Sequence, residues 1–278
     1  MLSCALAACT KPARSDFERH IAQVERETGS RIGVVAIDFS TSRRIEHRSN
    51  ERFLMCSTFK LLAAAAVLQR VDRGEEKLDR FVPYSQADIL AYAPVTKQHV
   101  AEGGMQLGAL CEAAIEQSDN TAGNLLLRTI GGPAGLTRFA RSLGDDVTRL
   151  DRMEPELNEW KTGDERDTTS PEAMCEDLRR LLAADVLSKE SRNRLDVWLQ
   201  HNETGLGLIR AGVPSGWRVG DKTGRSGDGA TNDVAVIYLP GRNPIYVAIY
   251  TFGGTDEQRS AAIASVTRGI CENFRSTH

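Results

Sequence analysis

The chain of 278 residues lacks the features that mark several large classes of protein. No stretch reaches the roughly eighteen apolar residues that a membrane-spanning helix needs. Basic residues do not outnumber acidic ones, and a net charge of −3 offers no basic stripe for nucleic acid. The six cysteines show no CxxC or CxxH spacing, which argues against a zinc site. We therefore expect a globular protein that acts on a small molecule, with no metal and no cofactor.

Hydrophobic residues make up 41% of the chain, enough for a substantial core, and their spacing changes along it. Strand-like patterns lie near both ends, whereas helical patterns fill most of residues 57–200. A capping-box pattern of Thr255 and Gln258 opens the last helix. The expected outer elements are a first helix, a hairpin, three late strands and a closing helix, at residues 16–28, 31–38 with 44–48, 217–224, 232–240, 244–252 and 255–274.

This order predicts an α/β fold in which both ends of the chain build one antiparallel five-stranded sheet, flanked by the N- and C-terminal helices. An all-α domain is inserted into it. We assign residues 16–55 plus 202–278 to a discontinuous α/β domain and residues 56–201 to the helical domain. Residues 1–15 are expected to be a leader or signal remnant and a linker. The active site should lie at the seam between the two domains.

Ser57 and Lys60 open an apolar helical run, CSTFKLLAAAAVLQRV, at residues 56–71. Positions i and i+3 share one helical face, so the amine can reach the hydroxyl that it would deprotonate. A serine near a helix start followed by a lysine is also common without any function. The meaning of the pair therefore depends on the rest of the chain.

Ser118, Asp119 and Asn120 form a short connection between two helical segments. Such residues are good helix-capping and turn residues, and taken alone that explanation suffices. Next to Ser57, the hydroxyl of Ser118 would be able to relay a proton. The amide of Asn120 would be able to hold a substrate carbonyl.

Lys-Thr-Gly occurs twice. Residues 161–163 lie in a polar stretch without a strand pattern, whereas residues 222–224 end a strand-like segment. A substrate along a sheet edge needs strand backbone, a cation for its carboxylate and a glycine that permits close approach. We therefore choose Lys222, Thr223 and Gly224.

A polar segment, RMEPELNEWKTGDERD, spans residues 152–167. Arg152 and Asp167 at its ends are able to pair and close it into an Ω-loop. Glu154 and Asn158 inside it are placed to hold one water, with Glu154 as the base. On their own they are ordinary loop residues.

Together, the four elements follow an order that is typical of one family. SxxK opens a helix, SDN lies between helices, ExxLN lies in a loop and KTG ends a late strand. SxxK, SDN and KTG are the signature of class A β-lactamases and penicillin-binding proteins. Over nearly its whole length after the leader, the chain resembles a class A serine β-lactamase. The ExxLN element separates that class from its penicillin-binding relatives.

The resemblance implies a role for each matched residue. Ser57 would attack the β-lactam carbonyl and become acylated, with the N–H groups of Ser57 and Arg225 as the oxyanion hole. Either Lys60, or Glu154 acting through water, would take the serine proton, and the sequence leaves this open. Glu154 would then activate the deacylating water. Ser118 and Lys222 would protonate the departing ring nitrogen.

The resemblance also implies substrate-binding residues and one unusual peptide bond. The Glu154–Pro155 bond is expected to be cis, as before the proline of the family's Ω-loop. The substrate-binding residues are Tyr92, Asn120, Asn158, Thr223, Gly224 and Arg225.

The chain departs from the family pattern at several positions. Where many members carry an arginine for the substrate carboxylate, this chain has Thr231 or Leu208, so we expect Arg225 to take part of that role. Cys56 faces Ser226 where some carbapenem-hydrolysing members have a second cysteine, so that disulfide cannot form. The partner position of Cys111 is likewise Ala64.

The first residues, MLSCALAACT, end in a segment that resembles the lipobox of a bacterial lipoprotein, with Cys9 as the acylated residue. A charged n-region and a longer apolar stretch are missing. We interpret the segment as the remnant of a signal peptide, and a chance match is the alternative. Export to the periplasm or beyond, with a possible lipid anchor at Cys9, is the expectation, as is a monomer.

Three functions fit these residues. The leading hypothesis is a hydrolase that destroys penicillins or cephalosporins and so confers antibiotic resistance. A peptidoglycan DD-peptidase or esterase on the same fold would use Ser57, Lys60, Ser118 and Lys222 without Glu154. A β-lactam sensor that stays acylated would not need the ExxLN loop, whose use is to release the acyl group.

Overall fold

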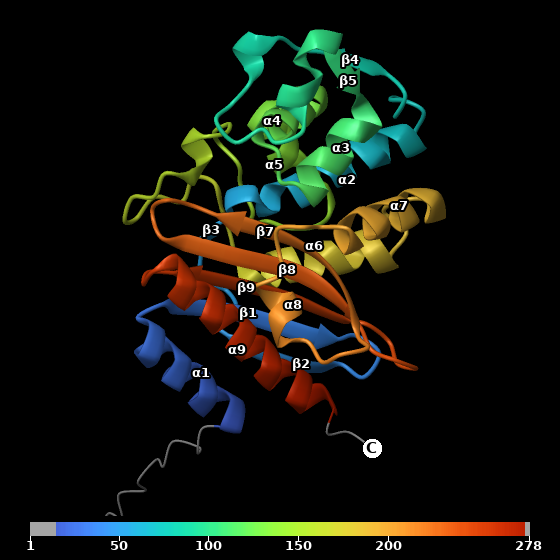
Figure 1. Cartoon of the computed structure of the whole chain (residues 1–278). Coiled ribbons are helices and arrows are strands. Elements are labelled where there is room, and N and C mark those ends of the chain that lie inside the picture. Colours follow the sequence, from blue (N-terminus) through green and yellow to red (C-terminus); the bar gives the residue numbers. More distant parts are fainter. Residues whose placement is uncertain (1–14, 276–278) are drawn as a thin grey trace, which may run out of the picture.

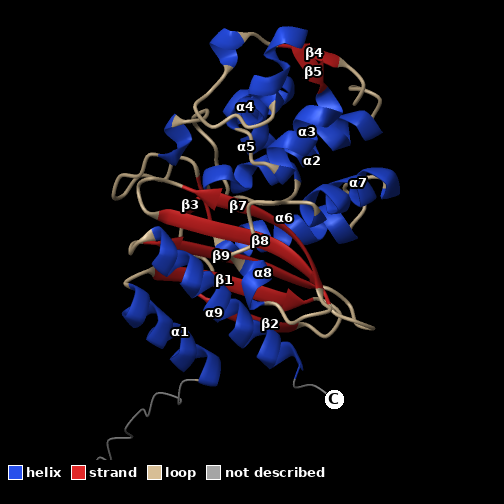
Figure 2. Cartoon of the chain, viewed as in Figure 1, coloured by secondary structure: helices blue, strands red, loops and turns tan. Residues whose placement is uncertain are grey.

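The computed structural model describes residues 15–275 and is built around one five-stranded antiparallel sheet, as predicted (Figures 1 and 2). The strands come from both ends of the chain and are ordered β2-β1-β9-β8-β7. Their bounds are β1 Arg31–Asp38, β2 Arg43–His47, β7 Arg218–Arg225, β8 Ala230–Tyr238 and β9 Ile245–Phe252. Strand β7 is therefore an edge strand, able to offer backbone groups to a ligand.

Alternate residues of the central strands enter two different hydrophobic clusters. On β1, Val34 faces the cluster of the terminal helices and Val35 the opposite one, as the two-residue period of a strand requires. Three helices cover the first face, which lies toward the lower front in Figure 1: α1 Asp16–Thr28, α8 Ile209–Gly212 and α9 Asp256–Arg275. The expected capping box of Thr255 and Gln258 is formed at the start of α9.

The opposite face of the sheet is covered by two helices from the middle of the chain. Helix α6, Pro171–Ala183, packs on β1, β8 and β9, and α7, Lys189–Gln200, packs on β7. Helix α7 also contacts helices of the upper layer. The sequence assigns both helices to the inserted domain, and their contacts with the sheet make them part of the seam.

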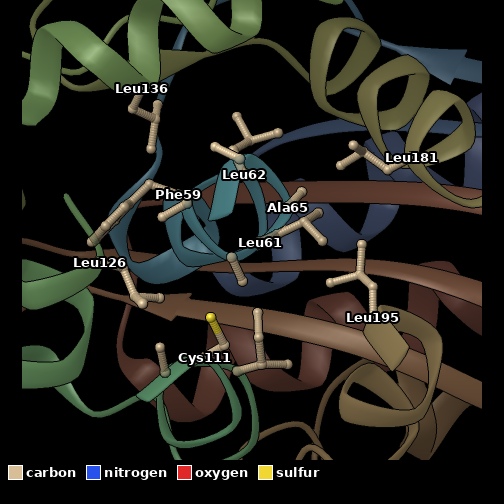
Figure 3. Packing of buried hydrophobic residues seen from close by; sticks show 14 of the residues in the cluster. Phe59, Leu61, Leu62, Ala65, Cys111, Leu126, Leu136, Leu181 and Leu195 are labelled. Atoms are coloured by element: carbon tan, nitrogen blue, oxygen red, sulfur yellow. The ribbon is translucent and has the colours of Figure 1, made fainter. Parts of the chain in front are cut away.

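The remaining helices form a layer beyond this seam, centred on α2, Phe59–Asp72. The first ten residues of α2 are all buried, so no side of the helix faces solvent until its last turn. Figure 3 shows Phe59, Leu61, Leu62 and Ala65 of α2 among side chains from several surrounding helices. The other elements of this layer are α3 Leu107–Glu116, α4 Asn120–Ile130, α5 Gly132–Ser142 and the short strand pair β4 Phe81–Pro83 with β5 Gly104–Gln106.

The expected strands lie within two residues of the observed bounds, but the helix that was expected to carry Ser57 begins later than predicted. Helix α2 begins at Phe59, and a separate 3₁₀ turn, Cys56–Thr58, carries Ser57. Cys56 has a φ of 48°, a left-handed conformation that a continuous α-helix does not allow. Ahead of it, the two-residue strand β3, Phe53–Leu54, pairs with β6, Thr168–Thr169, at the end of the polar loop.

Within residues 15–275, no helix is both long and apolar enough to cross a bilayer.

Candidate active site

Ser57 lies where the buried helix α2 meets the sheet edge. Gly224 of β7 passes so close that a Cβ on it would come within 3.1 Å of the Ser57 amide nitrogen and 2.8 Å of the Met55 carbonyl oxygen. Any larger residue at 224 would push the strand away from the serine. The glycine of the second KTG copy therefore brings the end of β7 against the turn that carries Ser57.

Lys60 is completely buried, and its ammonium group is surrounded by oxygen atoms. Nζ lies 2.8 Å from Ser57 Oγ, 2.8 Å from the Ser118 carbonyl, 2.7 Å from Asn120 Oδ1 and 3.3 Å from Glu154 Oε1. Burial lowers the pKa of Lys60, while the Glu154 carboxylate acts in the opposite direction. The side chain is thus within reach of the Ser57 proton.

Ser118 connects the two lysines of the site. Its hydroxyl accepts hydrogen bonds from Lys222 Nζ at 3.0 Å and Lys60 Nζ at 3.4 Å. Lys222 is also buried, and burial together with the nearby Lys60 charge lowers its pKa to about 7. Ser118 lies in the turn before α4 and has a left-handed backbone conformation, with a φ of 55°. The Ser118 hydroxyl is therefore placed to pass a proton from Lys222 to a ligand group that lies beside Ser57.

Glu154 approaches Ser57 from the loop side. Ser57 Oγ donates to Glu154 Oε1 at 3.3 Å, and Asn158 Nδ2 donates to Oε2 at 2.6 Å. The Glu154 backbone is held from α4, because Asn124 accepts from its N–H and donates to its carbonyl, both at 2.9 Å. The Glu154–Pro155 peptide is cis, as expected.

The loop that carries Glu154 is closed at its ends by an ion pair whose carboxylate is fully buried. Arg152 Nε lies 2.6 Å from Asp167 Oδ2, and Asp167 is fully buried. Oδ1 of Asp167 also accepts the backbone N–H groups of Asp151 and Arg152 at 2.8 and 2.9 Å. Residues 152–167 thus form the predicted Ω-loop, with one carboxylate satisfying three donors.

A cleft of about 360 Å³ opens beside Ser57. Its walls come from the turn of Ser57, the helical layer, the Ω-loop and strand β7, so it lies on the predicted seam. The residues that line it are Ser57, Tyr92, Ser118, Asn120, Asn158, Thr204, Thr223, Gly224 and Arg225.

Comparisons with known proteins give one answer. The model of the β-lactamase enzyme family matches residues 16–274. β-Lactamase AST-1 of Nocardia asteroides is 46% identical over 90% of this chain and 81% of its own, and β-lactamase L2 of Stenotrophomonas maltophilia is 46% identical over 92% and 84%. An ancestral class A β-lactamase structure has 54% identity and a TM-score of 0.91, covering 93% of this chain and 100% of its own. A putative class A β-lactamase, PenP of Rhodopseudomonas palustris, has 52% identity and a TM-score of 0.91 over 93% and 100%. The chain belongs to the class A β-lactamases.

As a β-lactamase, the enzyme is a hydrolase of the β-lactam amide. Of its two KTG sequences, the one at residues 161–163 is exposed on the outer part of the Ω-loop, and the one at residues 222–224 borders the cleft. The structure thus brings together the SxxK, SDN, ExxLN and second KTG elements that the sequence singles out.

Two of the expected substrate contacts lie at the cleft with different surroundings. Tyr92 is half exposed on the cleft wall, free to meet a ligand. Arg225 also lines the cleft, but its Nη1 is held by the Asp256 carboxylate at 2.6 and 2.7 Å. Thr231 and Leu208, the positions at which the family resemblance led us to look for an arginine, are both fully buried. A carboxylate-binding role for Arg225 would therefore have to compete with Asp256.

Sequence reasoning missed several residues that shape the β-lactamase site. Asn124 holds the Glu154 backbone, Thr204 lines the cleft and hydrogen-bonds to Thr223, and Asp256 holds Arg225. Asn124 lies four positions after Asn120, on the same face of α4, and that spacing was the one available signal. Thr204 and Asp256 stand in no pattern that would have distinguished them.

The last sequence expectations to compare with the structure concern the cysteines and a metal site. Cys56, Cys111, Cys175 and Cys271 are all free and buried, as expected. Cys9 lies outside the described residues. Among residues 15–275, no group of three or more His, Cys, Asp or Glu side chains is arranged to hold a metal.

Proposed function

We propose that the enzyme opens the β-lactam ring of penicillins and cephalosporins through an acyl-enzyme on Ser57. Ser57 Oγ bonds to the ring carbonyl carbon as its proton passes to a base, and the carbonyl oxygen becomes an oxyanion. The N–H groups of Ser57 and Arg225 stabilise that charge. The close approach of Gly224 to the Ser57 amide supports this pairing.

Two bases are within reach of the Ser57 proton. Lys60 Nζ has the shorter contact, 2.8 Å, and Glu154 Oε1 lies at 3.3 Å, able to act directly or through water. The pKa of Lys60, lowered by burial, makes a neutral amine more accessible than in water. Both routes leave the same product, an ester at Ser57.

Collapse of the tetrahedral intermediate breaks the bond between the carbonyl carbon and the ring nitrogen. The nitrogen takes its proton from the Ser118 hydroxyl, which lies 3.0 Å from Lys222 Nζ and recovers a proton from that ammonium or from Lys60. Lys222 and Thr223 hold the substrate carboxylate. Asn120 binds the side-chain amide of the substrate, and Tyr92 packs against the bound ligand.

Deacylation completes the cycle. A water between Glu154 and Asn158 attacks the ester carbonyl, Glu154 takes its proton, and the bond to Ser57 Oγ breaks as the oxygen regains a proton. The observation that carries this proposal is the single buried carboxylate beside Ser57, held at both oxygens and at both backbone groups. An enzyme that stays acylated would not need a carboxylate and an amide placed together to activate a deacylating water.

The test follows turnover of a chromogenic cephalosporin by the wild type and by Glu154→Ala. We expect many turnovers by the wild type. For the variant, we expect a burst followed by a slow steady state, with an adduct on Ser57 detected by mass spectrometry. A single stoichiometric burst by the wild type would identify a penicillin-binding enzyme or a sensor instead. If the burst of Glu154→Ala is as fast as acylation of the wild type, Lys60 is the base that takes the Ser57 proton. If the burst is slower, Glu154 is that base.

The proposal also covers the division into domains, the oligomeric state and the location of the enzyme. Residues 16–55 plus 202–278 form the α/β domain and residues 56–201 the helical domain, meeting at the cleft. The enzyme works as a monomer outside the cytoplasm, in the periplasm or secreted, where it protects the cell from β-lactams. A lipid anchor at Cys9 would keep it at the membrane, and labelling with a radioactive fatty acid would detect it.

A further inference from the structure

Asn232 is a fully buried asparagine on β8 whose side chain is bonded at both ends. Its Nδ2 donates to the carbonyl oxygens of Leu54 at 2.8 Å and Met55 at 3.2 Å. Its Oδ1 accepts the N–H of Thr251 on β9 at 3.3 Å. A buried amide with partners at both ends is fixed in position, and it fixes what it holds.

The carbonyls that Asn232 holds belong to the two residues just before the turn of the nucleophile. Leu54 ends β3, and Met55 precedes the 3₁₀ turn Cys56–Thr58. Cys56 adopts a φ of 48°, a conformation that a non-glycine residue keeps only when its neighbours hold it. The Met55 N–H is held on the Ω-loop side by the Asp167 carbonyl at 2.9 Å. Asn232 supplies the attachment on the side of the sheet.

Asn232 also stands directly opposite Gly224 in the β7–β8 register. Paired residues of an antiparallel sheet project from the same face, so the missing side chain at 224 leaves room for the turn and the amide at 232 reaches the turn's carbonyls. A Cβ at 224 would meet the Met55 oxygen at 2.8 Å. Gly224 thus leaves space for the turn that carries Ser57, and Asn232 holds that turn by donating hydrogen bonds.

We propose that Asn232 is a positioning residue of the oxyanion hole. By fixing the carbonyls of Leu54 and Met55, it sets the direction of the Ser57 N–H relative to the N–H of Arg225 at the end of β7. The inference rests on the proposed function, because those two N–H groups are the proposed oxyanion hole. Asn232 itself touches neither the substrate nor the reacting atoms, and its effect passes through the peptide groups that it holds.

The proposal predicts a loss of transition-state binding rather than of substrate binding. Two variants remove the donor: Asn232→Asp keeps the shape but presents an oxygen to the two carbonyls, and Asn232→Leu is apolar. We expect kcat for benzylpenicillin to fall by about 10- to 100-fold, the size expected when an atom of the site is misplaced by about 1 Å. The substrate dissociation constant, taken from the concentration dependence of single-turnover acylation, should change by less than about threefold.

A boronic acid supplies the readout that a purely structural role would not move. Phenylboronic acid adds Ser57 Oγ to its boron with release of the hydroxyl proton to the base, and one boronate oxygen takes the oxyanion position. We expect its affinity to fall in parallel with kcat across the variants. Asn232→Thr, which keeps one hydrogen-bond donor in the buried site, should recover part of both values.

A matched control separates positioning from stability. Thr267 is fully buried in α9, and its hydroxyl donates to the Ile263 carbonyl at 2.8 Å, far from the nucleophile in the sequence and on the other face of the sheet. Thr267→Val should lower the melting temperature, as loss of a buried hydrogen bond does, and leave kcat and boronate affinity unchanged. The active fraction of each enzyme is counted by mass spectrometry of the Ser57 adduct.

The outcomes are distinct. Unchanged kcat and boronate affinity per active site in Asn232→Leu and Asn232→Asp would overturn the inference while leaving the acyl-enzyme proposal intact. If neither variant folds, Asn232→Thr decides, because the inference requires its kcat and boronate affinity to fall together. Retention of turnover and boronate binding in Ser57→Ala would instead overturn the acyl-enzyme proposal itself.

Discussion

Lys222 and Ser118 are joined by a hydrogen bond of 3.0 Å between two buried side chains, one from the sheet edge and one from the helical layer. Burial and the neighbouring Lys60 charge lower the pKa of Lys222 to about 7. The residue that would hold the substrate carboxylate and return a proton to Ser118 therefore loses its charge as the pH rises through about 7.

We predict an alkaline limb in kcat/KM for penicillins near pH 7, because only the protonated Lys222 attracts the substrate anion. Binding of that anion raises the pKa of Lys222, so the limb in kcat should lie at higher pH. Lys222→Arg should move the kcat/KM limb beyond about pH 9, since a guanidinium stays protonated there. An alkaline limb that is unchanged in Lys222→Arg would assign it to another group, such as Lys60.

A second prediction concerns Arg225, whose side chain and backbone have separate proposed roles. Arg225→Ala removes the guanidinium but keeps the backbone N–H of the oxyanion hole. We expect KM for penicillins to rise by about 3- to 10-fold, less than a fully buried charged contact would give, because the side chain is 40% exposed and already paired with Asp256. The value of kcat should stay within about twofold.

The ion pair between Arg225 and Asp256 allows a second test of this prediction. Asp256→Asn removes the carboxylate that competes with the substrate for Arg225, so KM should fall rather than rise. Arg194→Ala, which breaks an exposed pair with Glu190 on α7, is the control and should change neither constant. Equal KM values in the wild type and Arg225→Ala would show that Lys222 and Thr223 hold the carboxylate without help.

A third prediction concerns stability. Asp177 on α6 is buried beside Asp145, and the burial, together with the second carboxylate, raises the pKa of Asp177 well above its usual range. The folded enzyme thus binds a proton that the unfolded chain releases at lower pH. Stability from this pair is complete below the unfolded-state pKa and is lost as the pH rises toward the folded-state pKa.

Asp177→Asn replaces the titrating carboxyl group by an amide, which donates hydrogen bonds and does not titrate. We expect it to stabilise the enzyme at pH 8 by about 1 kcal/mol, the size of one hydrogen bond, or roughly 2–4 °C in melting temperature. The gain should shrink at pH 5. Asp185→Asn, at a fully exposed position just after α6, is the control and should show no such dependence. A melting temperature that is lower in Asp177→Asn at both pH values would contradict the raised pKa of Asp177.

The sequence predicted the parts of the fold that depend on local pattern. Strand and helix periods gave the five strands and the helices at the two ends, because each buried face leaves a regular spacing of apolar residues. Motif order then identified Ser57 and Glu154 as partners although they lie 97 residues apart. The start of α2 was misplaced because the positive φ of Cys56 leaves no trace in hydrophobic periodicity.

Hydrogen bonds and ion pairs between residues that are distant in the sequence could not be predicted from the sequence. Asn232 and Leu54 are 178 positions apart, and Arg225 and Asp256 are 31 apart, with no motif to connect them. Such contacts are set by strand register and by which helix lies on which face, and both are outcomes of the whole fold. Placement of α6 and α7 on the sheet has the same origin, since an amphipathic helix does not encode the surface that it will cover.

The last prediction concerns the closure of the Ω-loop, residues 152–167. Asp167 satisfies three donors with two oxygens, one of them Arg152 Nε at 2.6 Å. In Asp167→Asn, one oxygen is replaced by an amide group that can only donate, so a donor faces either Arg152 or the loop backbone. Breaking a fully buried pair costs about 3–5 kcal/mol, and the cost here should be smaller because Arg152 is partly exposed. The loop that holds Glu154 should still loosen. We therefore expect deacylation to slow by about 10- to 100-fold, with acyl-enzyme accumulating during turnover.

The matched control for this change lies in the same loop. Asp164→Asn weakens a partly exposed pair with Arg166, which does not touch Glu154, and should leave deacylation unchanged with at most a small shift in melting temperature. Mass spectrometry of the enzyme quenched during steady-state turnover measures the acylated fraction, which should be high in Asp167→Asn and low in Asp164→Asn and the wild type. Equal acylated fractions in all three would mean that Asn124 and Asn158 hold Glu154 without help from the closure. Because Asn124 grips the Glu154 backbone from α4, the double change Asn124→Ala with Asp167→Asn should then be needed to trap the acyl-enzyme.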